Sequence, residues 1–400
     1  MRILFLTHRL PYAPNRGDRI RAYYLMRELA KFGKVSLFSL AHDADEQSRA
    51  GEVPFADSVH CVRVTRVRNF INGAARLLSS RPLTHSLLDA ADARSVLSSV
   101  VRTAPPDVVV AFCSGMARFA FEPPLEGRKL LIDFVDIDSA KWAELAKTAA
   151  FPMRWIYERE ASTLGRFEAS AAERADVAVV CNERERATLG AMAPSAEIEV
   201  LESGIDTEAF RPPDPPAPSS TVVFCGVMSY EPNRQGVRWF AEEVWPIVRS
   251  RRPDARFLIV GSDPTADVIA LPERDPSIEV VGRVPTVQPY LWKSGVSVAP
   301  LLVARGMQNK VLEALAAGLP TVVTPMVWIG LPVEARAGCV SAGTPEAFAQ
   351  HVLAILDLPP DERRLRAFSG LESLGWSNRF AALGSMIERT MGSRSTGQRP

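Results

Sequence analysis

A lysine and a glutamate three residues apart carry the clearest chemical signal in this 400-residue chain. Lys310 and Glu313 lie in the sequence Arg-Gly-Met-Gln-Asn-Lys-Val-Leu-Glu-Ala-Leu-Ala-Ala-Gly-Leu-Pro, residues 305–320. A cation in the first turn of a helix, beside the free backbone N–H groups, suits a phosphate. A carboxylate three residues later lies on nearly the same helix face and suits the two hydroxyl groups of a ribose. The pair therefore suggests a nucleoside diphosphate site.

The segments around this motif would place it at the edge of a sheet. Apolar runs at 296–300 and 321–324 predict buried strands, and residues 308–317 predict a helix that ends at Gly318, just before Pro320. Such a strand–loop–helix–strand unit brings a helix N-terminus to the carboxyl edge of a sheet, where open α/β folds bind ligands. The alternative is an exposed Lys310–Glu313 pair on a helix surface, worth only about 0.2–0.5 kcal/mol.

Two more loops in the second half of the chain are candidates for donor contacts. Gly226 follows a predicted strand, 221–225, and permits a tight turn or the close approach of a ligand. Arg234, near the start of the next predicted helix, 236–250, could bind a phosphate with two parallel hydrogen bonds, or it could be a solvated surface residue. Arg283 lies in a loop that could border the base or ribose, or could be an ordinary turn.

The first half of the chain offers a glycine between its first predicted strand and first predicted helix. Gly17 would let the backbone approach a bound group, and arginines at 16, 19 and 21 make this loop cationic. A single glycine is a weak motif, and no Gly-x-Gly-x-x-Gly is present. The alternative is a capped helix start with Asp18 as the N-cap, and both interpretations can hold together.

Three carboxylates follow another predicted strand, 129–133. Asp133, Asp136 and Asp138 could supply a base, a hydroxyl acceptor or a metal ligand. Asp138 could instead cap a helix predicted over 139–147. The five histidines show no metal-ligand spacing, and neither a Walker A sequence nor a Gly-x-Ser-x-Gly elbow occurs.

Composition indicates an ordinary globular protein. Hydrophobic residues make up 47% and charged residues 23% of the chain, with a net charge of +1, which argues against a nucleic-acid partner. The five scattered cysteines are typical of reduced thiols in a cytoplasmic protein. No apolar run approaches the roughly 18–20 residues that span a bilayer, so we expect any membrane contact to be peripheral.

Strand and helix patterns alternate along the chain, which predicts an α/β fold with two Rossmann-like, doubly wound domains facing across a cleft. Further strands are predicted at 2–7, 35–40, 108–112, 177–180, 198–201, 256–260 and 278–281. The predicted divisions are a first domain (1–206), a proline-rich linker (207–220), a second domain (221–375), a C-terminal helix that could return to the first domain (376–391), and a disordered tail (392–400).

One basic segment could form a surface. Residues 61–82 contain five arginines and no acid, interleaved with apolar side chains. This composition fits a patch resting on anionic lipid at the inner face of the cell membrane. A strand and helix with a solvated basic face would fit it equally well.

Several of these segments together resemble the GT-B retaining glycosyltransferases of family 4. The nearest resemblance is to the sugar transferases associated with bacterial exopolysaccharide and exosortase (PEP-CTERM) gene clusters. It covers nearly the whole chain and rests on residues 7–12, 17–21, 133–142, 202–206, 230–233 and 305–314. The family usually carries two glutamates in the last motif. Glu313 matches the second, whereas Arg305 stands at the position of the first.

The resemblance implies transfer of a sugar, with retention and without a bound metal or other cofactor, from a UDP or GDP sugar to a glycan or polyprenyl-linked acceptor. Gly17 would border donor and acceptor, Asp136 or Asp138 would orient the acceptor, and Arg305 would lie near the donor sugar. The implied donor-binding residues are Gly226, Asn233, Arg234, Arg283, Gly306, Gln308, Asn309, Lys310 and Glu313. Two alternatives are a non-catalytic nucleotide-sugar-binding protein and a nucleotide-sugar epimerase or hydrolase on the same fold.

Overall fold

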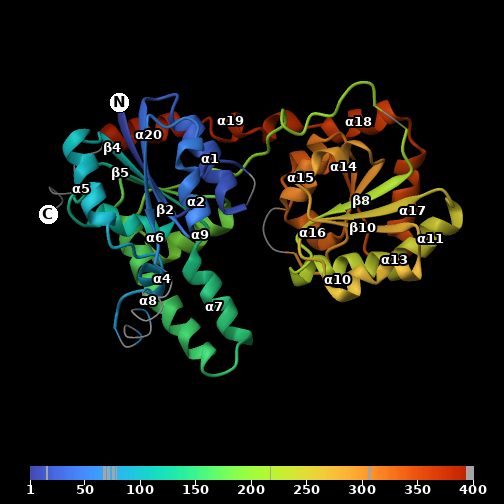
Figure 1. Ribbon diagram of the computed structural model, residues 1–400, viewed down its shortest axis with the longest axis horizontal. Helices are drawn as coiled ribbons and strands as arrows, with labels where there is room; N and C mark the ends of the chain where they lie inside the picture. Colours follow the sequence, from blue (N-terminus) through green and yellow to red (C-terminus); the bar gives the residue numbers. More distant parts are fainter. Residues whose placement is uncertain are drawn as a thin grey trace. The chain divides into compact units, whose positions relative to one another are not determined.

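In the computed structural model the chain forms two α/β units, each built on a parallel sheet (Figure 1). The structure describes residues 1–400 except 15–16, 66–68, 70–72, 74–76, 78, 217, 305–307 and 393–400. Contacts divide the chain into Met1–Ser203, together with the chain from Arg379 onward, and Gly204–Asn378. Two parallel sheets flanked by helices confirm the predicted α/β fold class.

The first unit has a seven-stranded sheet of order β3-β2-β1-β4-β5-β6-β7, in which every pair is parallel. The strands are β1 (Arg2–Thr7), β2 (Lys34–Ala41), β3 (Ser58–Arg63), β4 (Val108–Phe112), β5 (Leu130–Val135), β6 (Val177–Val180) and β7 (Ile198–Val200). Helices cover both faces, so central strands such as β4, Val-Val-Val-Ala-Phe, are apolar at every position.

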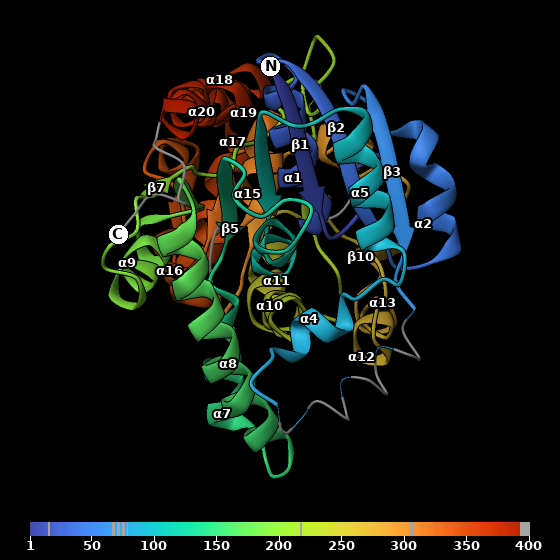
Figure 2. The ribbon, with the colours of Figure 1, turned by 90° about the vertical axis from the view of Figure 1, so that its left-hand side faces the viewer.

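Ten α-helices are described in or at the boundary of this unit. They are α1 (Gly17–Leu29), α2 (Ala44–Ser48), α4 (Leu83–Leu87), α5 (Ala93–Thr103), α6 (Ser114–Ala117), α7 (Asp138–Thr148), α8 (Met153–Arg174), α9 (Glu183–Met192), α19 (Trp376–Arg379) and α20 (Leu383–Gly392). Helices α7 and α8 form a hairpin that extends away from the sheet of this unit in both ribbon views (Figures 1 and 2).

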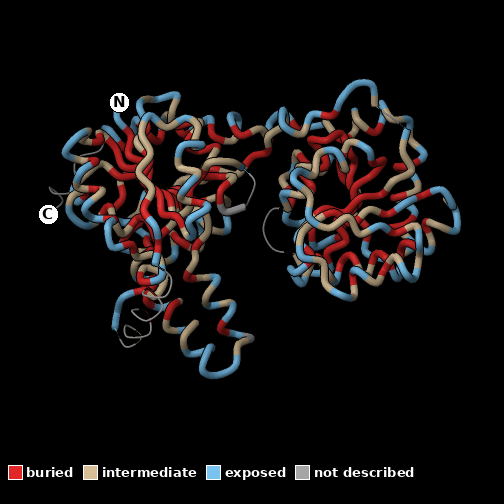
Figure 3. The backbone as a smooth tube through the Cα atoms, viewed as in Figure 1, coloured by how far each residue is buried: buried red, intermediate tan, exposed pale blue. Residues whose placement is uncertain are grey.

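The second unit has a six-stranded parallel sheet of order β10-β9-β8-β11-β12-β13. Its strands are β8 (Thr221–Cys225), β9 (Arg256–Val260), β10 (Ile278–Gly282), β11 (Val296–Ala299), β12 (Thr321–Val323) and β13 (Cys339–Ser341). Its α-helices are α10 (Glu231–Trp239), α11 (Trp245–Arg251), α12 (Ala266–Ile269), α13 (Leu271–Arg274), α14 (Gln288–Trp292), α15 (Asn309–Ala316), α16 (Pro325–Ile329), α17 (Pro345–Asp357) and α18 (Pro360–Phe368). The strands of each unit are largely buried (Figure 3).

Two of the helices predicted as continuous are interrupted in the structure. The helix predicted over 236–250 starts earlier, at Glu231, and contains a π-helical segment, Phe240–Val244, before α11. Pro246 follows this segment in the first turn of α11, and its missing N–H and bulky ring are incompatible with a regular α-helical bond there. The helix predicted over 376–391 is two helices, α19 and α20, and the turn between them contains the buried Phe380.

The proline-rich segment 207–220 packs within the second unit. Arg364 donates a hydrogen bond to the Pro213 carbonyl at 2.7 Å and contacts Asp214. The indole of Trp292 donates to the Phe210 carbonyl at 2.9 Å. Side-chain donors of the folded unit therefore bind a segment whose prolines cannot continue a helix or a sheet.

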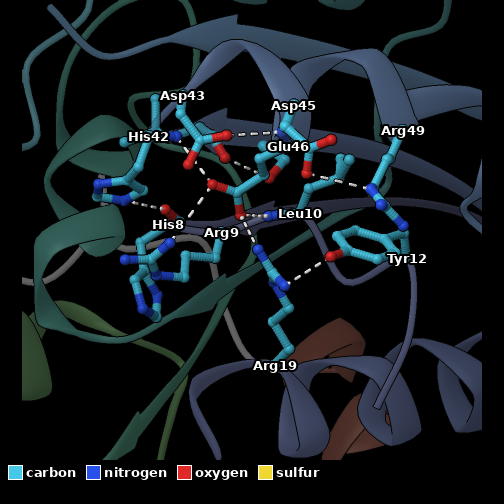
Figure 4. A network of polar contacts seen from close by, with 12 residues as sticks. His8, Arg9, Leu10, Tyr12, Arg19, His42, Asp43, Asp45, Glu46 and Arg49 are labelled. Atoms are coloured by element: carbon cyan, nitrogen blue, oxygen red, sulfur yellow. Dashed lines mark hydrogen bonds and ion pairs between the residues drawn. The ribbon is translucent and has the colours of Figure 1, made fainter. Parts of the chain in front are cut away.

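A buried carboxylate holds the loop that follows β1 (Figure 4). Glu46 in α2 accepts hydrogen bonds from the backbone N–H groups of Leu10 at 3.2 Å and His42 at 2.9 Å, and from Arg19 at 2.9 Å. Arg9 lies 3.4 Å away. Burial by itself would raise the pKa of Glu46, but these donors and the charges of Arg19 and Arg9 outweigh it and hold the pKa below its ordinary value.

We expect Glu46→Gln to destabilise the first unit by about 2–4 kcal/mol at pH 7, because it removes the counter-charge of two largely buried arginines. Since the pKa of Glu46 is lowered on folding, its stabilising effect is present above the unfolded pKa of about 4.3 and is lost as the pH falls through the folded value. Urea denaturation at pH 7 and pH 3 should therefore show the difference between wild type and variant shrinking in acid.

The matched control is Glu122→Gln, because Glu122 forms an exposed pair with Arg94. That change should lower the free energy of unfolding by no more than about 0.5 kcal/mol. Equal losses from the two substitutions would contradict a special role for Glu46.

Candidate active site

The second sheet reverses its strand order between β8 and β11. From β8 the chain continues outward to β9, and from β11 it continues outward to β12 on the other side. The loops after these two neighbouring strands therefore diverge and leave a crevice at their carboxyl ends, which is where open α/β sheets bind ligands. Helix α10 follows β8 and helix α15 follows β11, so both helices begin at this edge.

Side chains from these two helices meet across the switch point. Lys310, the second residue of α15, has its ammonium within hydrogen-bond distance of Asn233 Oδ1 in α10. The same ammonium lies 4.9 Å from the ring centroid of Phe224. Asn233 is only 4% exposed, and its Nδ2 donates to the Val227 carbonyl at 2.8 Å. Asn233 thus fixes Lys310 rather than facing solvent itself.

Burial perturbs both charged groups of the motif. It lowers the pKa of Lys310 to about 8, against the opposing attraction of Cys225 and Glu313. It raises the pKa of Glu313 to about 7, against the opposing attraction of Lys310. Neither side chain is exposed, and no salt bridge joins the two in the described part of the chain. The alternative of an exposed surface pair is therefore wrong.

The carboxylate of Glu313 has unused hydrogen-bonding capacity. Among the described residues, none donates a hydrogen bond to it. Nearby, burial raises the pKa of the Cys225 thiol to about 12, so this neighbour remains neutral at ordinary pH. The Glu313 side chain is partly exposed and its pKa is strongly perturbed, so its carboxylate is a candidate to accept hydrogen bonds from a ligand.

Gly226 is required by the position of Asn233. A Cβ atom at residue 226 would lie 2.8 Å from Asn233 Nδ2, which is closer than real Cβ atoms approach other atoms. Any other residue would push Asn233 away and so release Lys310. The glycine acts on the candidate site through Asn233.

The remaining donor-side candidates are placed differently. Arg234 forms ion pairs with two acidic side chains, Glu231 at 2.9 Å and Asp267 at 3.9 Å. Arg283 is 76% exposed and lies 3.6 Å from Asp263. The structure therefore engages both arginines in ion pairs with acids of the second unit.

The start of α15 contains the other predicted donor contacts. Gln308 is the N-cap residue of the helix, and Asn309 is its first, exposed residue. Arg305 and Gly306 lie outside the described residues.

In the first unit the predicted acids meet a lysine. Asp136 follows β5 and Asp138 opens α7, and Lys141 lies 3.0 Å from the first and 3.2 Å from the second. Burial by itself would raise the pKa of Asp136, but Lys141 and a hydrogen bond from Cys181 outweigh it and lower the pKa. The described residues contain no cluster of three or more His, Cys, Asp or Glu that could hold a metal ion.

The other predicted residues of this unit have local roles. Gly17 is the first residue of α1. Asp133 forms a buried ion pair with Arg21 at 2.9 Å and is not available to a ligand. The predicted N-cap role of Asp138 is wrong, because Glu168 from α8 accepts from the N–H groups of Asp138 at 3.1 Å and Ser139 at 3.3 Å. A distant carboxylate thus satisfies the N-terminus that a local one was expected to satisfy.

Sequence analysis missed one pair in the first unit. The sheet reverses its order between β1 and β4, and the next residues after these strands are His8 and Cys113. His8 Nδ1 lies 3.5 Å from Cys113 Sγ, and the imidazole stacks on Phe112. The available signal was that both residues directly follow central strands. The histidines were instead judged by metal-ligand spacing.

The fold and the second unit have clear relatives. Residues 219–357 match the protein family described as glycosyl transferases, group 1. This segment includes β8, α10, β11 and α15, and so contains the crevice with Lys310 and Glu313. No curated protein sequence matches the chain.

Solved structures show the same fold over the whole chain. The sucrose-phosphate synthase of Thermosynechococcus elongatus has a TM-score of 0.66 at 16% identity, covering 98% of this chain and 100% of that one. HepE of Anabaena, in complex with UDP and glucose, has a TM-score of 0.61 at 13% identity, with 98% and 100% covered. WaaG, a glycosyltransferase involved in lipopolysaccharide biosynthesis, has a TM-score of 0.60 at 15% identity, with 96% and 99% covered. The fold is therefore GT-B, as found in glycosyltransferases.

Removing the charge of Glu313 should stabilise the ligand-free protein. The pKa of Glu313 is raised on folding to about 7, so ionisation opposes folding once the pH exceeds the unfolded value. We expect Glu313→Gln to raise the free energy of unfolding by about 1–3 kcal/mol at pH 8, and by much less at pH 4, where the carboxyl is protonated in both states. Thermal denaturation at the two pH values measures this.

The matched control is Glu279→Gln, at an exposed position on β10. It should change stability by less than about 0.5 kcal/mol. A destabilised Glu313→Gln protein would show that the carboxylate has a structural role instead.

Proposed function

We propose that this protein is a glycosyltransferase that uses a nucleoside diphosphate sugar, with UDP or GDP as the nucleotide, as its donor. The observation that carries the proposal is the Lys310–Glu313 arrangement at the switch point of the second sheet. A largely buried ammonium and an acceptor without a described donor match the diphosphate and the ribose of one ligand. The family match to residues 219–357 and the UDP bound in HepE support the same class of donor.

The charge of Lys310 and the N-terminus of α15 would stabilise the leaving diphosphate. As the bond between the sugar and the diphosphate breaks, negative charge grows on the phosphate oxygens. A fixed ammonium and the N-terminus of a helix stabilise that charge without the reorganisation that water would need. We propose that they do so in place of a metal ion. The acceptor hydroxyl would attack on the face that the diphosphate leaves, so that the anomeric configuration is retained.

The first unit would bind the acceptor. Asp136 and Asp138 present carboxylate oxygens near the end of β5, and both lie beside Lys141, at 3.0 and 3.2 Å. Ionised carboxylates orient sugar hydroxyl groups by accepting hydrogen bonds. We propose a glycan or polyprenyl-linked acceptor in bacterial exopolysaccharide synthesis. The enzyme would then act at the inner face of the cell membrane, with the basic segment 61–82 in peripheral contact with anionic lipid.

Nucleotide binding tests the donor site directly. Thermal shift with UDP, GDP and their sugars should show one preferred base. A ligand at about 100 times its dissociation constant raises the free energy of unfolding by roughly 2.7 kcal/mol. Lys310→Met and Glu313→Ala should each remove most of the shift. Lys293→Met, at an exposed lysine of the same unit, should keep it.

Product analysis then separates the remaining functions. Release of the nucleotide that depends on an added acceptor identifies a transferase. Release to water identifies a hydrolase, conversion of the bound sugar identifies an epimerase, and binding without turnover identifies a binding protein. If no nucleotide shifts the melting temperature, the proposal fails.

The donor affinity should depend on pH through Lys310. Its pKa is lowered to about 8 in the folded protein, so the cationic form is lost as the pH rises through that value. We expect the affinity for a nucleoside diphosphate sugar to fall by about tenfold between pH 7 and pH 9. Calorimetric titration of wild type measures this fall. Lys310→Met should bind more weakly and should not show this tenfold fall, and an equal fall in that variant would assign the titration to another group.

A further inference from the structure

A small cavity lies between the proline-rich segment and α18 of the second unit. Its walls include four prolines of residues 212–216, the side chains of Trp292 and Leu319, and two arginines, Arg363 and Arg364. Its volume is about 80 Å³. One water needs about 10–15 Å³, and pockets for drug-sized ligands measure about 300–1,000 Å³. The cavity therefore suits a small ion or a single chemical group rather than a nucleotide.

This cavity is separate from the crevice that holds Lys310. Ser294 and Gly295, which line it, directly precede β11, so they lie at the amino edge of the sheet. Gly318, another lining residue, lies just beyond the last turn of α15, whereas Lys310 lies in the first turn of that helix. The eight residues of α15 span about 12 Å. The cavity and the crevice therefore lie at opposite ends of this helix.

A buried arginine without an acidic partner lines the cavity. Arg363 is only 5% exposed. Its Nη1 donates a hydrogen bond to the Ser219 carbonyl at 3.0 Å, while its Nε is buried and has no hydrogen-bond partner among the described residues. No acid in the described part of the chain forms an ion pair with it. Arginines are almost never fully buried unless they are paired, so this charge lacks its usual counter-charge.

The surrounding chain is shaped to admit this guanidinium. A Cβ atom at Gly295 would overlap Nη1 of Arg363 and the Ser219 carbonyl oxygen, so the glycine leaves the space that the side chain occupies. Burial lowers the pKa of Arg363, and the charge of Arg252 lowers it further. Arg252 itself pairs with Asp357 at 2.6 Å. The environment on the page thus opposes the charge of Arg363 and offers nothing to neutralise it.

The acids nearest in sequence are engaged elsewhere or face solvent. Asp214 contacts Arg364, and its side chain is 85% exposed. Asp361 and Glu362, in the first turn of α18, are exposed. Since Asp214 balances Arg364, the positive charge of Arg363 remains at the cavity wall. An anion that enters the cavity would therefore meet one uncompensated cation.

We propose that this cavity binds a small oxyanion, a phosphate or carboxylate group, which forms an ion pair with Arg363. The planar guanidinium matches the geometry of both groups and binds them with parallel hydrogen bonds. The ion would neutralise a buried charge and connect α18 to the proline-rich segment, so its binding stabilises the second unit. This site is independent of the donor site proposed above.

Thermal denaturation of the full chain tests the proposal. Sodium phosphate and sodium acetate are each compared with sodium chloride at equal ionic strength. At about ten times its dissociation constant, the matching oxyanion should raise the melting temperature of wild type by about 3–5 °C. Arg363→Met should remove this shift, and Arg256→Met, at an exposed arginine that starts β9, should keep it. The larger of the phosphate and acetate shifts identifies the class of ligand.

Two further variants separate this cavity from the donor crevice and guard against misfolding. Lys310→Met should keep the oxyanion shift, and Arg363→Met should keep the shift with UDP. Without ligand, Arg363→Met should melt at or above the wild-type temperature, because an unpaired buried charge is removed. Arg363→Lys retains a cation but lacks the planar fork, so we expect the oxyanion to bind about tenfold more weakly.

Three results would overturn the proposal. Phosphate and acetate could both act like chloride on wild type, or the oxyanion shift could persist in both Arg363 variants. The shift could also vanish in Lys310→Met, which would assign the ion to the donor crevice. Absence of a UDP shift in wild type, with an oxyanion shift that depends on Arg363, would contradict the donor site alone.

Discussion

Burial of two opposite charges at one edge of the second sheet is the constraint on which the candidate site depends. Desolvation drives Lys310 and Glu313 toward their neutral forms, so their pKa values approach neutrality from opposite sides. Asn233 is the side chain that holds the ammonium, and it is itself held by the Val227 carbonyl. The position of the charge therefore depends on the loop after β8. Under the proposed function, a bound diphosphate would place negative charge beside Lys310 and so favour the protonated form of this side chain.

In the first unit, by contrast, buried carboxylates are surrounded by cations and hydrogen-bond donors. Glu46 is surrounded by arginines and backbone donors, and Asp133 is paired with Arg21. Buried charge costs least when each oxygen has a donor, so these groups stabilise loops at the carboxyl edge. Asp136 and Asp138 differ, because each is about one-third exposed and the two share one ion-pair partner, Lys141. They are the carboxylates of this edge that remain accessible to a hydroxyl group.

Local patterns predicted much of the fold. Apolar runs located strands β4, β6, β8 and β9 at their observed bounds, because central parallel strands are buried on both faces. Gly318 ends α15 with a φ of +77°, as its place before Pro320 predicted. Two edge strands escaped prediction: the six residues of β3 run into the basic segment, and β13 has only three residues. The π-helical segment also escaped, since its cause, Pro246, fits the first turn of a new helix equally well.

Within the candidate site, sequence could predict residue types but not their partners. Lys310 and Glu313 are three residues apart, so helical geometry places them on nearly the same face of one helix. The contact between Lys310 and Asn233 joins residues 77 apart, and that between His8 and Cys113 joins residues 105 apart. Strand order decides such contacts, and one chain's local pattern does not contain strand order. Sequence likewise did not show that Arg234, a predicted phosphate contact, forms an ion pair with Glu231 in the same helix.

Both units follow the same topological rule and differ in what they place at the switch point. The second unit places a cation there, held by a neutral amide, and this arrangement suits an anionic leaving group. The first unit places His8 beside the Cys113 thiol, whose pKa burial raises to about 12, so the thiol stays protonated. That pair presents hydrogen-bonding groups without a strong local charge, and with the carboxylates beyond β5 it suits a polyhydroxylated ligand. Under the proposed function, this difference between the two switch points would match a nucleotide donor in the second unit and a sugar acceptor in the first.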